Sequence, residues 1–153
     1  MSLPLFPSGL TLVALVLALA MAVSCAAEPK PGAVDPLAAL QGNWVLAELD
    51  GAAVPNLGEG LAKPGLTIAE EGRLSGFAGV NRFAGVLDTE ALARGQFESS
   101  PLASTKMAGP PAAMEFEQRF LKAVEDADGY RWEGTALLLT RGSTTLARLT
   151  RAT

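Results

Sequence analysis

Few side chains in this sequence could carry out chemistry. It contains no histidine, so the usual general base and the commonest zinc ligand are missing. Its one cysteine, Cys25, ends a long apolar stretch. Ser104-Thr105-Lys106 could suggest a Ser–Lys hydrolase, but ordinary strand positions explain these residues better. We therefore expect no catalytic residues, no cofactor and no metal site, and a protein that is not an enzyme.

The acidic groupings point the same way. Glu115 and Glu117 are two residues apart on an expected helix, so their carboxylates face different directions. Residues 126–129 resemble a fragment of a calcium loop, but the further oxygen ligands and the terminal glutamate at fixed spacing are absent. We interpret them as a solvated turn.

Asn81 and Arg82 are the stronger candidates for a binding site. They lie at the centre of residues 75–85, where three glycines and two aromatic residues flank them. Asparagine tolerates left-handed backbone and bonds its own chain, which favours a structural turn. Arg82 could bind a carboxylate or phosphate through two hydrogen bonds, or could pair with a nearby carboxylate or backbone carbonyl. The sequence predicts a turn here that is either a binding site or structural.

Aromatic side chains could line a pocket between a sheet and a helix. The candidates are Trp44, Phe77, Phe83 and Trp132, with Tyr130 beside them. Packing in the core is the alternative role, because aromatic residues dominate small cores.

The first 24 residues read as a signal peptide. Residues 10–23 are a continuous apolar run, short for a membrane span but typical of a secretory signal. Ala22-Val23-Ser24-Cys25 resembles the signal of bacterial lipoproteins, in which cleavage precedes a cysteine that then carries a diacylglycerol. Cys25 is thus the expected lipidation site, with acyl chains such as palmitate in a bilayer. Residues 25–34, rich in proline and glycine, are the expected tether.

Two other readings of the N-terminus stay open. An ordinary signal peptide could be cut at a nearby Ala-x-Ala site, or residues 3–27 could be an uncleaved anchor. Lipidation predicts a protein in the cell envelope, facing the periplasm. Ala26 stands where an aspartate would retain many lipoproteins at the inner membrane, so the outer membrane is favoured. The net charge of −4 gives no electrostatic footprint for nucleic acid.

The rest of the chain predicts short strands with one long helix. Residues 43–49 should form the first strand, with Trp44, Leu46 and Glu48 on one side. Short strands every 8–12 residues or so favour a meander, sandwich or small barrel. The arginines after Tyr130 read as solvated strand faces.

The helix is expected over residues 112–125. Phe116, Phe120 and Val124 repeat every four residues and form an apolar stripe. Glu115 and Arg119 should pair on the exposed face, and Gly129 is a candidate left-handed cap.

Four landmarks in order along the chain resemble the META domain, also called the HslJ-like family, of bacterial envelope proteins. They are residues 42–46 with Asp50-Gly51, residues 75–85, residues 102–110 with 114–117 and 120–121, and residues 130–134 with 137–139. The resemblance covers nearly all of residues 42–149 and assigns residues 35–153 to one such domain. Two positions depart from the family together: Val80 and Gly109 stand where many members have cysteine.

The resemblance implies a mainly β fold with one helix (α+β), in which a long helix packs on a curved antiparallel sheet, lipocalin-like or a partly open barrel. It also implies association with envelope stress and antibiotic tolerance, without a family-wide enzymatic activity. We therefore expect a membrane lipid at Cys25 and an unknown envelope protein as partners. The alternative is a lipocalin-like domain that binds a small ligand inside its sheet.

Overall fold

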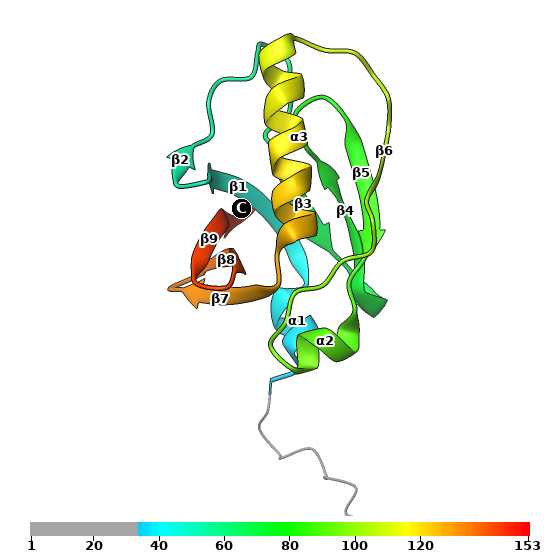
Figure 1. The fold of residues 1–153 in the computed structure, drawn as a ribbon, viewed down its shortest axis with the longest axis vertical. Helices are drawn as coiled ribbons and strands as arrows, with labels where there is room; N and C mark the ends of the chain where they lie inside the picture. The colour runs from blue at the N-terminus through cyan, green and yellow to red at the C-terminus, as the bar shows by residue number, and fades with distance from the viewer. Residues whose placement is uncertain (1–33) are drawn as a thin grey trace, which may run out of the picture. The chain divides into compact units, whose positions relative to one another are not determined.

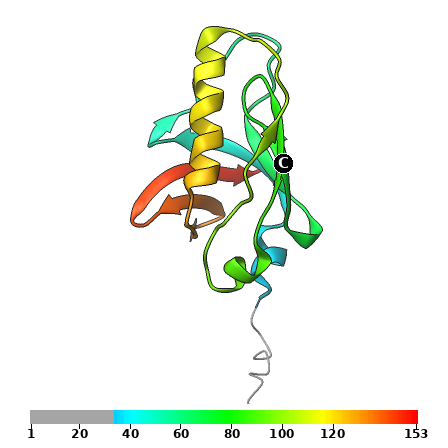
Figure 2. The ribbon, with the colours of Figure 1, turned by 45° about the vertical axis from the view of Figure 1, so that its right-hand side comes forward.

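The computed structural model describes residues 34–153, so the signal peptide predicted for residues 1–24, Cys25 and most of the tether lie outside the described residues. One long helix, α3, lies against a sheet of short strands (Figures 1 and 2). The helices are α1 (Pro36–Leu40), α2 (Thr89–Ala93) and α3 (Pro111–Asp126), with a single 3-10 turn at Glu70–Gly72. The strands are β1 (Gly42–Leu49), β2 (Ala52–Ala53), β3 (Gly65–Ile68), β4 (Arg73–Phe77), β5 (Arg82–Val86), β6 (Ala103–Ser104), β7 (Gly129–Glu133), β8 (Ala136–Arg141) and β9 (Thr144–Arg151).

All nine strands belong to one antiparallel sheet. Its order is β6-β5-β4-β3-β1-β9-β8-β7, and β2 pairs with β1 beside this path. β9 therefore lies between β1 and β8. It joins the part of the sheet formed by β1 and β3–β6 to the part formed by β7 and β8. The sheet is open, which confirms the predicted α+β fold with a curved antiparallel sheet.

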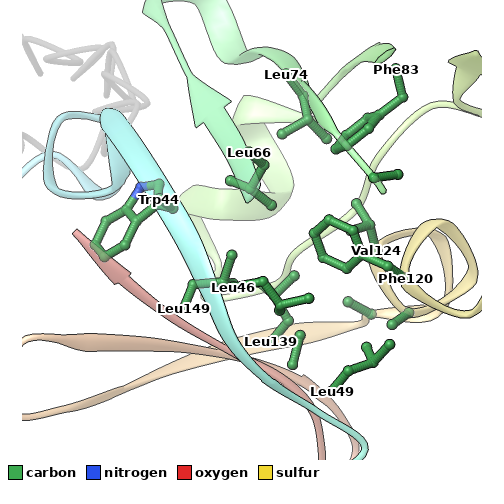
Figure 3. Packing of buried hydrophobic residues seen from close by; sticks show 14 of the residues in the cluster. Trp44, Leu46, Leu49, Leu66, Leu74, Phe83, Phe120, Val124, Leu139 and Leu149 are labelled. Carbon is green, nitrogen blue, oxygen red and sulfur yellow. The ribbon is translucent and has the colours of Figure 1, made fainter. Parts of the chain in front are cut away.

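One apolar core fills the space between the sheet and α3. Figure 3 shows Leu46 and Leu149 from β1 and β9, with Leu66 and Leu74 from β3 and β4, pointing to the same interior as side chains from α3. Trp44 belongs to the same buried cluster. Phe120 of α3 meets Phe83 of β5 edge to face, with ring centroids 6.0 Å apart. The predicted stripe of Phe116, Phe120 and Val124 is buried.

Two glycines of residues 75–85 allow close packing where a side chain would not fit. A Cβ on Gly76 would lie 2.5 Å from the Phe83 ring. Gly79 has φ +144°, and a Cβ there would lie 3.2 Å from the Ala113 carbonyl oxygen of α3. The turn between β4 and β5 can therefore approach the first turns of the helix.

The predicted alternation along the first strand fails after Leu46. Trp44 and Leu46 are buried together as expected, but Leu49 is buried where Glu48 was predicted to share their side. The pairing of β1 with β9 shifts register between Leu46 and Glu48. A β-bulge adds one residue and so reverses which side chains face the core beyond it.

The helix departs from its predictions in two places. Gly129 is not a left-handed cap: Ala127 follows α3 in extended conformation, and Gly129 already pairs with Thr140 as the first residue of β7. Arg119 bonds Asp50, after β1, at 2.8 Å rather than the neighbouring Glu115. In both cases a partner distant in sequence replaces the local contact.

Candidate functional site

A buried carboxylate organises the region around Asn81. Glu117 lies on α3 with only 5% of its surface exposed, and Asn81, in the turn between β4 and β5, is 2% exposed. The backbone N–H groups of Val80 and Asn81 donate to Glu117 Oε2 at 3.0 and 2.5 Å. The Asn81 amide donates to Oε1 at 2.8 Å. Three neutral donors thus satisfy this charge, as a buried carboxylate requires.

Asn81 also holds the segment after β6. Its Oδ1 accepts from the Thr105 hydroxyl and from the Met107 backbone N–H, both at 2.7 Å. Its Nδ2 donates to the Met107 carbonyl at 3.1 Å in addition to Glu117. One amide therefore joins the β4–β5 turn, the residues after β6 and α3. We call Val80, Asn81, Thr105, Met107 and Glu117 the Asn81–Glu117 cluster.

Helical spacing in the sequence places Glu117 among the buried residues of α3, although its spacing from Glu115 does not. Glu117 is four residues after Ala113 and three before Phe120, both of which are buried on α3. The residue is thus inside the apolar stripe, where a charge needs a partner from another element. Glu115, as expected, faces another direction and is exposed.

The two members of the predicted turn are used differently. Asn81 is buried and its side chain bonds two other segments of the protein, so this residue acts as a structural junction. The Arg82 side chain is exposed and borders a shallow pocket on the sheet. Among the described residues, no hydrogen bond or ion pair of its guanidinium is found. Arg82 is therefore available to a ligand in a way that Asn81 is not.

The four aromatic candidates do not line one pocket between sheet and helix. Trp44 and Phe83 are buried in the core, whereas Phe77 is half-buried and Trp132 is 43% exposed. The two tryptophan rings lie 5.7 Å apart at an angle of 50°. Trp44, Phe77 and Phe83 border the same shallow pocket as Arg82, while Trp132 does not.

Arg151, the last residue of β9, forms a second polar junction. Its guanidinium donates to the carbonyls of Gln41 at 3.0 Å and Ala39 at 2.9 Å, at the end of α1, and lies 4.6 Å from the centre of the Trp44 ring. Trp44 Nε1 donates to the Leu40 carbonyl at 2.8 Å. We call Arg151, Trp44 and the carbonyls of residues 39–41 the Arg151 clamp.

Arg131, Arg141 and Arg151 are exposed on their strands, as predicted, and Arg148 is half-buried, but each also has a partner elsewhere in the fold. Arg131 donates to Thr145, Arg141 pairs with Asp126, and Arg148 pairs with Glu133 at 2.6 Å. The hydrogen bond that the Arg148 guanidinium donates to the Glu133 carboxylate raises the pKa of Arg148 above its ordinary value. Spacing along a strand could not show these partners because all of them come from other elements.

Pockets open on the outer side of the sheet rather than in its interior. The larger has a volume of about 610 Å³ and lies between β1 and the loop of residues 54–64. The second, of about 320 Å³, is the shallow pocket beside Arg82, and Val45 and Lys63 border both. The interior itself is occupied by the core side chains.

The remaining chemical candidates stay apart. Ser104 pairs with Phe83 in the sheet, Lys106 is exposed, and no hydrogen bond between them is found within residues 34–153. In the same residues no three acidic side chains gather closely enough to hold a metal. None of the helices described there has the length and apolar character to cross a membrane.

Comparison with known proteins identifies the domain but no activity. The family model described as "META domain" matches residues 36–153. Similar folds include a protein from Burkholderia xenovorans solved by NMR, with a TM-score of 0.56, 24% identity and 99% of each chain covered. A "duf4847 family protein" from Bacteroides vulgatus has a TM-score of 0.50 and 14% identity over 74% of this chain and 94% of its own. No curated protein matches this sequence.

Proposed function

This chain belongs to the META domain family, and we propose that it is a non-enzymatic lipoprotein of the cell envelope. In this proposal the acyl chains on Cys25 hold it at a membrane, periplasm-facing, with the outer membrane favoured. Its domain supports envelope integrity, or tolerance of stress and antibiotics, through contact with another envelope protein.

The filled interior is the observation that carries this proposal. Leu46, Leu139, Leu149, Phe83 and Phe120 occupy the space between sheet and helix. Glu117, the buried acid on α3, already accepts three hydrogen bonds from the protein. The inner surface is thus used for folding, which leaves the outer surface for partners.

Mass spectrometry of the protein from its native envelope tests the anchor. The mass should equal the chain from Cys25 onward plus two or three acyl groups, since one chain alone binds a bilayer only marginally. A Cys25→Ala variant should lose the acyl mass and the membrane association. A wild-type mass without acyl groups would refute the anchor.

A deletion strain tests the role in the envelope. Deletion should increase sensitivity to membrane-active antibiotics, and the wild-type gene should restore tolerance. Cys25→Ala, matched for protein level, should not restore it. Unchanged tolerance in the deletion strain, or full rescue by Cys25→Ala, would contradict a role that depends on the anchor.

Small-ligand binding is a second candidate, which the pocket of about 610 Å³ favours. Its volume lies in the range typical of ligand sites. The pocket lies under the loop of residues 54–64 rather than inside the sheet. Photolabelling of that loop by an apolar probe, and its loss on Leu61→Trp, which fills the pocket, would support the candidate.

A further inference from the structure

The two outer pockets adjoin each other and differ in chemistry. Val45 of β1 and Lys63 of the loop border both of them. A molecule that enters the larger pocket can therefore extend past Lys63 into the smaller one. The chemistry of each pocket then specifies one part of that molecule.

The larger pocket, the loop pocket, suits an apolar group. Its walls include Val45, Ala47, Val54, Leu57 and Leu61. Leu57 belongs to the buried core, and Val54 and Leu61 pack against that core. The core therefore holds this apolar wall in place. Polar side chains border it only at Asn56, Lys63 and Thr150.

The smaller pocket, the Arg82 pocket, suits an anion. Lys63 and Arg82 border it, together with the polar side chains of Asn43, Thr67 and Ser75. Strand pairing aligns Val45, Gly65, Phe77 and Arg82 in one row across β1, β3, β4 and β5, so the row runs from the loop pocket to the guanidinium. No acidic side chain borders either pocket.

Lys63 and Arg82 have no carboxylate partner in the described part of the chain. The four ion pairs found there use Arg119, Lys122, Arg141 and Arg148. The lining of the Arg82 pocket thus carries two positive side chains and no negative one, although the whole chain has a net charge of −4. An oxyanion between Lys63 and Arg82 would supply the missing negative charge.

We propose that this face binds a single-chain anionic amphiphile, with its apolar chain in the loop pocket and its oxyanion head between Lys63 and Arg82. The inference rests on the second candidate function and names its ligand class. The head can be a carboxylate or a phosphate, since both match the guanidinium and the ammonium.

Photolabelling of the full-length protein in zwitterionic nanodiscs tests this assignment. The probes are three twelve-carbon chains that carry a diazirine: a carboxylate, a phosphate and a neutral alcohol. Mass spectrometry measures labelling of residues 54–64. We expect the anionic probes to label this loop more than the alcohol does. Lys63→Gln/Arg82→Gln should reduce anionic labelling about three- to tenfold, because each exposed charge contact contributes modestly.

A matched variant controls for overall charge. Arg73→Gln/Lys106→Gln removes two cations that border neither pocket and should leave labelling unchanged. Equal labelling by anionic and neutral probes, or an equal effect of both double variants, would overturn the anionic assignment while leaving a ligand pocket in place. Absence of loop labelling by every probe would overturn both the assignment and the second candidate function. Whichever of the two anionic probes labels residues 54–64 more identifies the preferred head group as a carboxylate or a phosphate.

Discussion

The Asn81–Glu117 cluster and the Arg151 clamp both tie a helix to the sheet by one charged side chain, but their surroundings differ. Glu117 is buried, and all its partners are N–H groups of the turn after β4. Arg151 is exposed, and its partners are carbonyls at the end of α1 and the face of Trp44. When a buried partner is removed, the polar groups that it bonded are left with no hydrogen-bond partner, because water does not reach them. Exposed groups that lose a partner bond water instead. The two junctions should therefore contribute very differently to stability.

The largest expected effect comes from removal of the buried acid. Glu117→Ala leaves the N–H groups of Val80 and Asn81 and the Asn81 amide without their acceptor. We expect a loss of roughly 3–5 kcal/mol in the free energy of unfolding, measured by urea titration. Glu115→Ala, on the exposed face of the same helix, should change it by less than about 0.5 kcal/mol. Similar effects of the two substitutions would mean that the cluster contributes no more than a surface residue.

A covalent link beside the cluster should stabilise it. A Cβ on Gly109 would lie 3.3 Å from the Val80 Cβ, so the two positions where the family often has cysteine are neighbours in space. Val80→Cys/Gly109→Cys in a Cys25→Ala background should form a disulfide that closes a loop of about 30 residues and adds about 3–4 kcal/mol. Thiol titration before and after oxidation measures the bond. Two thiols that stay free after oxidation would disprove the expected proximity.

The clamp should give a smaller effect. Arg151→Ala removes two hydrogen bonds and the contact with Trp44, and should cost about 1–2 kcal/mol in urea unfolding. Arg151→Lys should recover only part of this, because an ammonium cannot place two fixed donors while its charge lies on the ring. Arg119→Ala, which breaks an exposed pair with Asp50, should cost at most about 1 kcal/mol. A loss for Arg151→Ala as large as that for Glu117→Ala would remove the contrast between the junctions.

An exposed carboxylate gives the smallest effect and a different pH dependence. The hydrogen bond from Lys122, assisted by its charge and that of Arg141, lowers the pKa of Asp126 below its ordinary 3.8. A lowered pKa in the folded state contributes stability above the unfolded value, and this is lost as pH falls through the folded pKa. Wild type should therefore be slightly more stable than Asp126→Asn at pH 7, and the difference should close below about pH 4. A difference that persists at pH 2 would exclude this ion pair as its cause.

Local patterns in the sequence predicted the elements better than the junctions. The Asp50-Gly51 hairpin, the start of α1 at Pro36 and the apolar stripe of α3 all depend on neighbouring residues, and all are present. The turn predicted at residues 79–82 is found one residue earlier, at 78–81, since Arg82 already belongs to β5. The partners of the Asn81 amide, Thr105 and Met107, come from another part of the chain. The burial of Glu117 could have been inferred from helical spacing; the donors that satisfy it could not.

The bulge in β1 and the role of Arg151 show the same limit. The alternation of Trp44 and Leu46 predicts a buried face, yet no local signal marks the point where pairing with β9 shifts register. Arg151 is adjacent to no acidic residue in sequence, and its contacts are with backbone carbonyls, which every residue carries. Long-range partners decide these features.

The position of β9 constrains how the chain reaches its native state. β9 pairs with β1 across roughly 100 residues, so this seam of the sheet carries a high loop-closure entropy and a large contribution to contact order. A chain interrupted before Thr144 would leave the hydrogen-bonding edges of both β1 and β8 unpaired, and such edges recruit other chains. Slow pairing of β9 with β1 would keep the polypeptide unfolded for longer. An unfolded chain can be threaded through a narrow pore, but it requires protection from self-association until β9 has paired with β1 and β8.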